Sequence, residues 1–191
     1  LDETRKTAER RAAELRAPET WYPLRLLVCE SCWLAQTEDY AGREALFTRD
    51  YAYFSGFSSS WQEHTRRYAE AMAARFALGR DSCVVEVAAN DGTLLHHVRE
   101  AAIPCYGVEP TASTAAAARA RGIEIVEAFF GTALAAQLAA EGRCADLVAA
   151  NNVLAHVPDI NDFVAGFALL LKPQGVATFE FPHLLRMVRE N

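Results

Sequence analysis

The sequence predicts an α/β fold, a mostly parallel doubly wound sheet that follows a small N-terminal module. Three observations carry this prediction. From Cys83 onward, short apolar runs alternate with alanine-rich helical segments, the pattern of parallel strands joined by crossover helices. The first of these runs ends in an acidic residue and a turn of small residues that opens a helix. Upstream, two short apolar runs flank the closely spaced Cys29 and Cys32.

The alternating region predicts a strand and helix order that can be compared with the structure. The strands are expected at residues 83–88, 104–109, 123–127, 146–150 and 176–181. The helices between them are expected at residues 93–101, 113–121, 132–141 and 160–171. A preceding helix over 61–78, with Ser60 as its N-cap, is indicated by apolar residues four positions apart.

Three parts of the chain follow from this order. Residues 1–45 form the module around the cysteine pair, where 4–15 fit a helix or a disordered tail equally well. Residues 46–79 form a connecting segment that ends in the helix over 61–78, and 80–191 form the α/β core. The chain starts without Met and stops just after a strand-like run, so we expect a piece of a longer protein that lacks the C-terminal part of the core.

Composition restricts the partners and the compartment. A net charge of −6 over 191 residues offers no basic surface for nucleic acid. No apolar run approaches the roughly 20 residues that cross a bilayer, so no membrane is expected. The five cysteines form no secreted disulfide pattern, which favours the cytoplasm. The oligomeric state is not indicated by any feature of the sequence.

The turn after the first strand suits a ligand that carries a positive group. Its small residues let the backbone approach a bound molecule, and Glu86 or Asp91 can attract the amino group of a methionyl moiety. A phosphate would be repelled there, and the spaced glycines of a dinucleotide-binding turn are missing. A plain strand-end carboxylate remains the alternative for Glu86. The candidate cofactor contacts in this stretch are Glu86, Ala88, Asn90, Asp91 and Gly92.

Glu109 ends the second strand, where a carboxylate can accept both hydrogen bonds of a ribose diol. A cap for the following helix is the alternative. Because nicotinamide and adenosyl cofactors share this feature, the first turn decides between them, and it favours S-adenosylmethionine. Asn151 and Asn152 follow the fourth strand and either close the cofactor pocket or cap the loop before Pro158.

Several motifs together resemble the sugar C-methyltransferases that act on nucleotide-linked 4-keto-6-deoxysugars. They are YAYFSG at 51–56, EVAANDGTLL at 86–95, GVEP at 107–110, ANNVLAHVPD at 150–159 and EFPHLL at 180–185. The resemblance covers the chain from Tyr22 to its end. It implies an N-terminal zinc-binding module, a Rossmann-like class I S-adenosylmethionine domain, and a C-terminal domain that helps to hold the sugar nucleotide.

The chain departs from this family in two places. The family's zinc module uses two cysteine pairs, whereas only Cys29 and Cys32 are present, so the zinc site is incomplete in this chain. A simple turn with two thiols is the alternative. The family's tyrosine and histidine cluster, which is thought to supply the general base, follows the fifth strand and would lie beyond Asn191, so the identity of the base stays open.

Four residues are candidates for contact with the sugar. His156 and His183 follow the fourth and fifth strands, on the side of an open parallel sheet where ligands bind. Histidines packed under a loop are equally expected. Tyr51 and Tyr53 could bring phenol groups to the sugar, or form an aromatic plug between the two modules.

The function predicted from these residues is S-adenosylmethionine-dependent C-methylation of a nucleotide-linked 4-keto deoxysugar through an enolate. Neither the methylated carbon nor the nucleotide follows from the sequence. A module that binds the cofactor without catalysis, or serves as a scaffold, is the alternative. An NAD-dependent oxidoreductase ranks last, because it conflicts with the acidic first turn.

Overall fold

The computed structural model describes residues 21–48 and 51–190 and divides the chain into two compact units, Leu1–Gly42 and Arg43–Asn191. The first unit contains a hairpin of β1 (Leu26–Val28) and β2 (Ala35–Thr37), which pair antiparallel. Arg25 and Glu38 form an ion pair beside the hairpin. The helix or tail expected over 4–15 lies outside the described residues.

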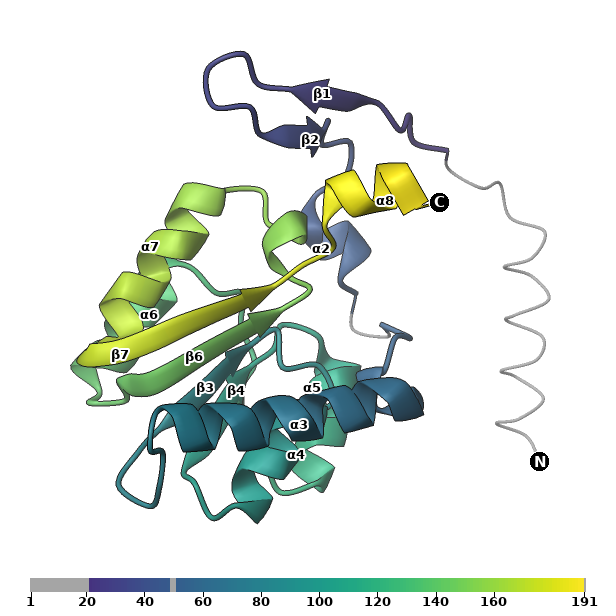
Figure 1. The fold of residues 1–191 in the computed structure, drawn as a ribbon. Coiled ribbons are helices and arrows are strands. Elements are labelled where there is room, and N and C mark those ends of the chain that lie inside the picture. Colours follow the sequence, from purple (N-terminus) through teal and green to yellow (C-terminus); the bar gives the residue numbers. More distant parts are fainter. Residues whose placement is uncertain (1–20, 49–50, 191) are drawn as a thin grey trace, which may run out of the picture. The chain divides into compact units, whose positions relative to one another are not determined.

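The second unit is built on one five-stranded sheet in the order β5-β4-β3-β6-β7, with all neighbours parallel (Figure 1). Its strands are β3 (Val84–Val87), β4 (Cys105–Val108), β5 (Glu124–Val126), β6 (Ala145–Asn151) and β7 (Leu171–Glu180). The chain begins in the middle of the sheet, builds outward through β4 and β5, and then returns to the other side of β3. This is the doubly wound arrangement that the sequence predicts.

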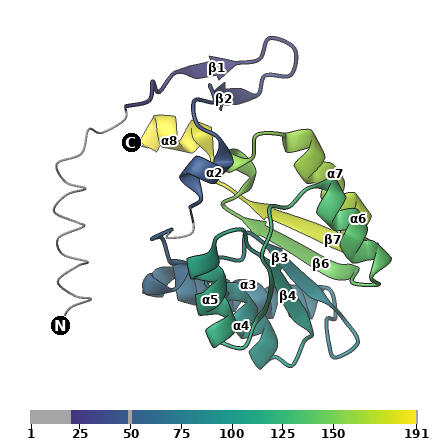
Figure 2. The same cartoon turned by 180° about the vertical axis from the view of Figure 1, so that it is seen from behind.

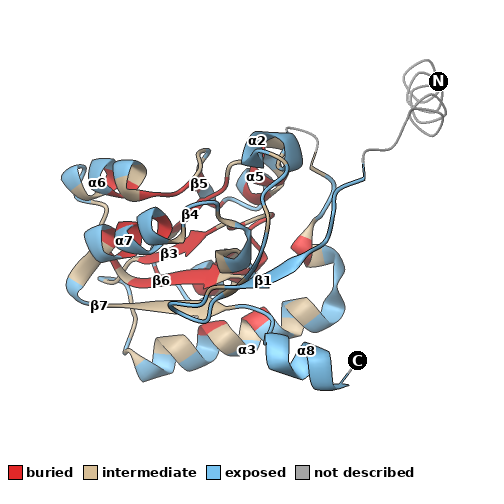
Figure 3. Ribbon diagram, turned by 90° about the horizontal axis from the view of Figure 1, so that it is seen from above, coloured by how far each residue is buried: buried red, intermediate tan, exposed pale blue. Residues whose placement is uncertain are grey.

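Helices cover both faces of the sheet (Figures 1 and 2). One face packs against α3 (Ser59–Arg75), α4 (Thr93–Glu100) and α5 (Ala112–Ala120), and the other against α6 (Thr132–Ala140) and α7 (Ile160–Leu170). Because side chains alternate along a strand, Val84 joins the first core while Val85 joins the second. Burial on both faces explains why the strands are apolar runs, and Figure 3 shows the buried residues concentrated between the two helix layers.

The last strand begins earlier than the expected start at residue 176. Leu171 follows α7 directly and pairs with Ala145, whereas Val176 pairs with Leu147, so the register shifts between these two pairs. Lys172 lies in the irregular stretch, and its ammonium contacts the Asp146 carboxylate at 2.7 Å. The first half of β7 contains polar residues and an irregular pairing, so it does not form the uninterrupted apolar run by which the other strands were predicted.

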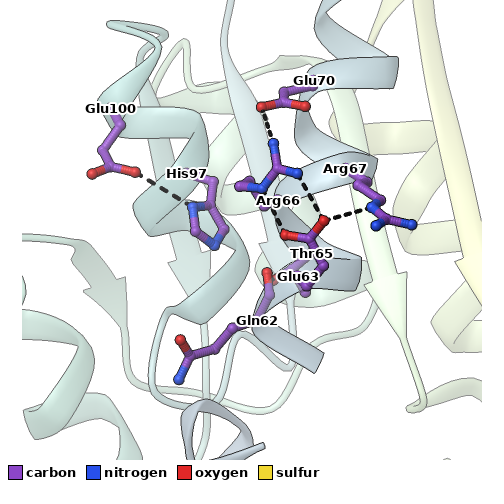
Figure 4. Close-up of polar contacts among 8 residues, drawn as sticks. All are labelled: Gln62, Glu63, Thr65, Arg66, Arg67, Glu70, His97 and Glu100. Carbon is purple, nitrogen blue, oxygen red and sulfur yellow. Dashed lines mark hydrogen bonds and ion pairs between the residues drawn. The ribbon is translucent and has the colours of Figure 1, made fainter. Parts of the chain in front are cut away.

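Helix α3 is capped by Ser58, and the expectation of Ser60 as N-cap is wrong. The Ser58 hydroxyl accepts from the Trp61 amide at 3.2 Å, because the helix begins at Ser59 and this amide is the one its cap can reach. Ion pairs follow the exposed side of the helix, where Arg66 contacts Glu63 and Glu70 (Figure 4).

Four short elements were not expected from the sequence. They are α2 (Arg43–Leu46), the 3-10 turns η1 (Ser55–Phe57) and η2 (Leu154–His156), and α8 (Leu184–Glu190). Each is too short for a periodic pattern to stand out. Among the described helices, none has the length and apolar character needed to cross a membrane.

Candidate functional site

A cavity of about 630 Å³ opens at the carboxyl ends of β3, β4 and β6, within the second unit. The order of the strands reverses between β3 and β6, and ligands of open α/β sheets bind at such switch points. The volume lies in the range of small-molecule sites, roughly 300 to 1,000 Å³. Glu86, Ala88, Asn90, Glu109, Asn151 and Asn152, all expected to contact a cofactor, line it together with Tyr51, Tyr53 and His156.

The turn after β3 has an unusual backbone. Ala88, Asn90 and Gly92 have φ angles of 59°, 49° and 73°, so the chain alternates through the left-handed region, which costs energy for a residue such as alanine. Between them, the Ala89 amide donates to the Val108 carbonyl at 3.1 Å. This strain is concentrated where the backbone borders the cavity, as is common at ligand sites.

Gly107 in β4 allows this turn to lie close to the sheet. A Cβ at this position would lie 2.6 Å from the Ala89 Cβ and 2.6 Å from Ile125 Cδ1. Any other residue would push the turn away from β4. The glycine of the GVEP motif therefore shapes the cavity wall although it is not itself among the described residues that line the cavity.

Glu86 is a buried carboxyl with an unused oxygen. It is 5% exposed, and its Oε2 has no hydrogen-bond partner among the described residues. Burial, followed by the charges of Glu109 and Asp91, raises its pKa well above the usual value. A cationic group placed in the cavity would offset both the burial and the neighbouring negative charges, so Glu86 suits a ligand with a positive charge.

Most of the hydrogen-bond acceptor positions of the Glu109 carboxylate are used by groups of the protein. Its Oε1 accepts from the Thr111 amide at 3.0 Å and from the Thr111 hydroxyl, and its Oε2 accepts from the Asn90 amide at 2.9 Å. A carboxylate oxygen has about two acceptor positions, so one position remains, on Oε2. One acceptor position is thus free for a ligand, whereas the expected contact with a ribose diol needs two. The other positions hold the turn after β3 and Thr111, the residue that precedes α5.

Asp91 and Gly92 do not line the cavity, although both were expected to contact the cofactor. The Asp91 carboxylate is 2% exposed and contacts Ser55, Gly56, Thr93 and Arg121. Gly92 caps α4 in the left-handed conformation, close behind Ala118 and Ile123. Both residues support the turn from its protein side.

The candidate sugar contacts are divided between two places. Tyr51, Tyr53 and His156 line the cavity, whereas His183 does not and is exposed just before α8. Burial, then the charges of Glu109 and Tyr53, raises the pKa of Tyr51. Tyr51 therefore keeps its proton at neutral pH and is a hydrogen-bond donor near Glu109.

Phe129 and Arg43 are among the wall residues that the sequence did not predict. Phe129 follows β5 at the same edge of the sheet, and the Arg43 guanidinium lies 4.4 Å from its ring centroid. The Phe129-Phe130 pair directly after an expected strand was a usable signal, because the carboxyl ends of parallel strands meet at one edge. Arg43 gave no signal, since α2 itself was not expected.

The cysteine pair expected to bind zinc lies in the hairpin of the first unit. Cys29 and Cys32 border the tight turn between β1 and β2. Amide N–H groups of Cys32 and then Ser31 lower the pKa of the Cys29 thiol, which favours the thiolate that zinc requires. Within residues 21–48 and 51–190, however, no three His, Cys, Asp or Glu residues are grouped for metal binding. Two thiolates fill half of a tetrahedral shell.

Comparison with known protein families assigns the domain that contains this site. The family model "Methyltransferase domain" matches residues 61–190, which include the turn after β3, Glu109 and the whole sheet. The chain belongs to this methyltransferase family. A second model, "Putative zinc binding domain", matches residues 9–47 around the cysteine pair. The expected order of a zinc-binding module followed by a Rossmann-like methyltransferase domain is confirmed.

Individual relatives agree with this assignment. The C-methyltransferase NovU of Streptomyces niveus is 31% identical over 173 residues, covering 91% of this chain and 41% of NovU. The chain thus spans less than half of that relative. The match confirms the resemblance to C-methyltransferases that the motifs predict.

Solved structures confirm the fold. DesVI of Streptomyces venezuelae superposes with a TM-score of 0.53 at 20% identity, covering 66% of this chain and 53% of DesVI. A S-adenosylmethionine-dependent methyltransferase from Clostridium acetobutylicum gives a TM-score of 0.54 at 12% identity, covering 68% of this chain and 54% of that chain.

Proposed function

We propose that this chain binds S-adenosylmethionine in the cavity at the switch point and serves a C-methyltransferase whose acceptor is a nucleotide-linked 4-keto deoxysugar. The observation that carries the proposal is the buried Glu86 carboxyl with its unused oxygen, in a chain of the methyltransferase family. Bound S-adenosylmethionine supplies a methyl group on a positively charged sulfur. The residues of the chain bind it, orient it and exclude water.

The charge of the cavity favours this cofactor over NAD. Four acidic residues and one arginine are among the described wall residues: Glu86, Glu109, Asp159, Asp162 and Arg43. S-adenosylmethionine carries two positive groups and one carboxylate, whereas NAD carries a pyrophosphate that these carboxylates would repel. Glu86 suits the methionyl ammonium, and the free position on Glu109 Oε2 suits one ribose hydroxyl. The phenol of Tyr51, also in the wall of the cavity, is a further candidate hydrogen-bond donor to the cofactor.

The acceptor class is supported by the sequence resemblance and by the C-methyltransferase NovU. Carbon next to a ketone is a weak acid, so transfer to it requires a general base, typically worth ~100 to 10,000-fold, and a methyl group held in line with the enolate. His156 is the one histidine among the described wall residues and is a candidate for proton transfer or for sugar binding. Tyr53, 62% exposed at the wall, is a candidate for hydrogen bonding to the sugar.

Zinc is part of the proposal as a structural ion. Cys29 and Cys32 would supply two thiolates, and two further ligands would come from outside residues 21–48 and 51–190. The ion would hold the hairpin turn together and would take no part in methyl transfer.

The test is a reaction with methyl-labelled S-adenosylmethionine and a nucleotide-linked 4-keto-6-deoxysugar. Transfer of label to carbon, located by NMR, supports the full proposal, and exchange of the proton beside the ketone in heavy water supports the enolate. A second candidate, a module that binds the cofactor without turnover, is favoured by the exposure of His156 and Tyr53, the wall residues that would hold the sugar. It predicts cofactor binding with neither label transfer nor exchange.

A further inference from the structure

A short segment over residues 51–56, here called the strap, contributes to the wall of the cavity. Tyr51, Tyr53 and Ser55 all line it. The Tyr51 carbonyl accepts from the Ser113 hydroxyl at 2.8 Å, which ties the start of the strap to α5. The strap is joined to the cofactor turn mainly through two side chains of that turn, Asn90 and Asp91.

Asn90 is bonded on both sides. Its Oδ1 accepts from the Ser55 amide at 3.0 Å, and its Nδ2 donates to the Tyr53 carbonyl at 3.1 Å. The backbone N–H of Asn90 donates to Glu109 Oε2 at 2.9 Å. One residue therefore connects the strap with the carboxylate that we assign to the ribose.

Asp91 has no acceptor position left for a ligand. Its Oδ1 accepts from the hydroxyls of Ser55 and Thr93 at 2.8 and 2.7 Å. Its Oδ2 accepts from the Gly56 amide at 3.0 Å and from Arg121 Nη2 at 3.3 Å. A carboxylate offers about four such positions, and all are used.

Gly56 makes this contact with Asp91 sterically possible. A Cβ there would lie 2.6 Å from Asp91 Oδ2 and 2.7 Å from Arg121 Nη2. The strap thus approaches the carboxylate as closely as a peptide group can. Buried charged hydrogen bonds of this kind are strong and fix geometry.

We propose that Asn90 and Asp91 are positioning residues rather than cofactor ligands, and that they hold the strap so that strap order and cofactor affinity are linked. The inference rests on the proposed function and reassigns two residues of its expected site. A ligand that contacts Tyr51 and Glu109 favours the ordered strap. When the strap is already ordered, ligand binding loses less conformational entropy. Such linkage is reciprocal by thermodynamic necessity.

The experiment combines amide hydrogen exchange over residues 51–57 with titration by S-adenosylhomocysteine. In the parent, the ligand should slow exchange at Ser55 and Gly56. Asp91→Asn replaces charged hydrogen bonds by weaker neutral ones, so we expect strap exchange to rise and ligand affinity to fall, each by about tenfold. Ser55→Ala should act in the same direction with a smaller effect, and Ser55→Thr, which keeps the hydroxyl, should restore most of it.

The matched control is Glu127→Gln, which alters an exposed carboxylate paired with Arg119. It should leave both measurements unchanged. Circular dichroism and thermal melting establish which variants fold. If Asp91→Asn does not fold, Ser55→Ala and Ser55→Thr decide, because they alter one small side chain.

Three outcomes would overturn the inference. Weaker ligand binding with unchanged strap exchange would make Asp91 a direct ligand. Faster strap exchange with unchanged affinity would make the contact structural only. A parent that binds S-adenosylhomocysteine without slowing the strap would remove the linkage while leaving the proposed function intact, whereas a parent that binds no ligand would defeat both.

Discussion

The end of the cavity that we assign to the cofactor and the side that we assign to the acceptor are built differently. At the proposed cofactor end, Glu86 and Glu109 are 5% and 4% exposed, and backbone and side-chain hydrogen bonds join the turn after β3 to Val108 and Glu109. On the side proposed for the acceptor, His156 is exposed in the loop after β6, whose one regular element is the 3-10 turn η2. Side chains that are already held in place bind a ligand at a lower entropic cost. An exposed loop needs further groups to enclose its ligand. Changes at the cofactor end should therefore have the larger effects.

The largest effect is expected from Glu109→Ala. This change removes the proposed ribose contact and also the acceptors for the Asn90 amide and for Thr111. Each lost charged hydrogen bond costs roughly 1.5 to 3 kcal/mol, partly offset by water, so S-adenosylhomocysteine should bind about 10- to 100-fold more weakly. Calorimetric titration checks this, with the exposed Glu124→Ala as control. Equal affinity for Glu109→Ala and the parent would show that the ribose lies elsewhere.

Gly107→Ala tests whether the close packing of the turn matters. The added Cβ would lie 2.6 Å from the Ala89 Cβ, and such overpacking typically costs 1 to 3 kcal/mol. Thermal unfolding should show the loss of stability, accompanied by weaker ligand binding because the turn is displaced. Gly79→Ala is the control, since nothing lies within 4 Å of its added Cβ. Similar melting curves for the two variants would contradict the packing argument.

Glu86→Gln should change the dependence of stability on pH. Because burial raises the folded-state pKa of Glu86 above its ordinary value of 4.5, the folded protein holds this proton more tightly than the unfolded chain. Its contribution to stability therefore falls as the pH rises above about 4.5 and levels off beyond the raised pKa. Denaturant unfolding at several pH values should show a smaller decline for Glu86→Gln than for the parent.

The same substitution should alter ligand binding in the opposite sense. If the Glu86 carboxylate holds the methionyl ammonium, affinity for S-adenosylmethionine should increase with pH in the parent, and this increase should be reduced in Glu86→Gln. If the affinity of the parent stays constant over the pH range in which its stability changes, Glu86 does not contact the ligand.

The smallest effect concerns the cysteine pair. Amides directed at Cys29 lower its pKa, whereas burial raises the pKa of Cys105 to about 11. Iodoacetamide should therefore modify Cys29 well before Cys105, as mass spectrometry of the peptides can show.

Zinc should be held weakly by this chain, so elemental analysis after dialysis against chelator should find little metal. One zinc ion retained per chain would contradict this prediction and would show that residues of this chain complete the site.

The sequence predicts the parts of this structure that depend on local patterns. The five strands appear as apolar runs because both faces of the sheet are buried, and the small residues at 88–92 mark the turn. Contacts between distant residues left no such signal. Ser55 meets Asp91 across 36 positions, so the carboxylate expected to face a ligand is instead used by the protein. Arg43 and α8 were missed because short helices lack a readable period.

The most direct test of the central claim is a calorimetric titration of the unmodified chain with S-adenosylhomocysteine and with NAD. We expect one site for S-adenosylhomocysteine and no heat of binding for NAD, because the described wall residues of the cavity include four acidic side chains and a single arginine. Binding of NAD in preference to S-adenosylhomocysteine would contradict it.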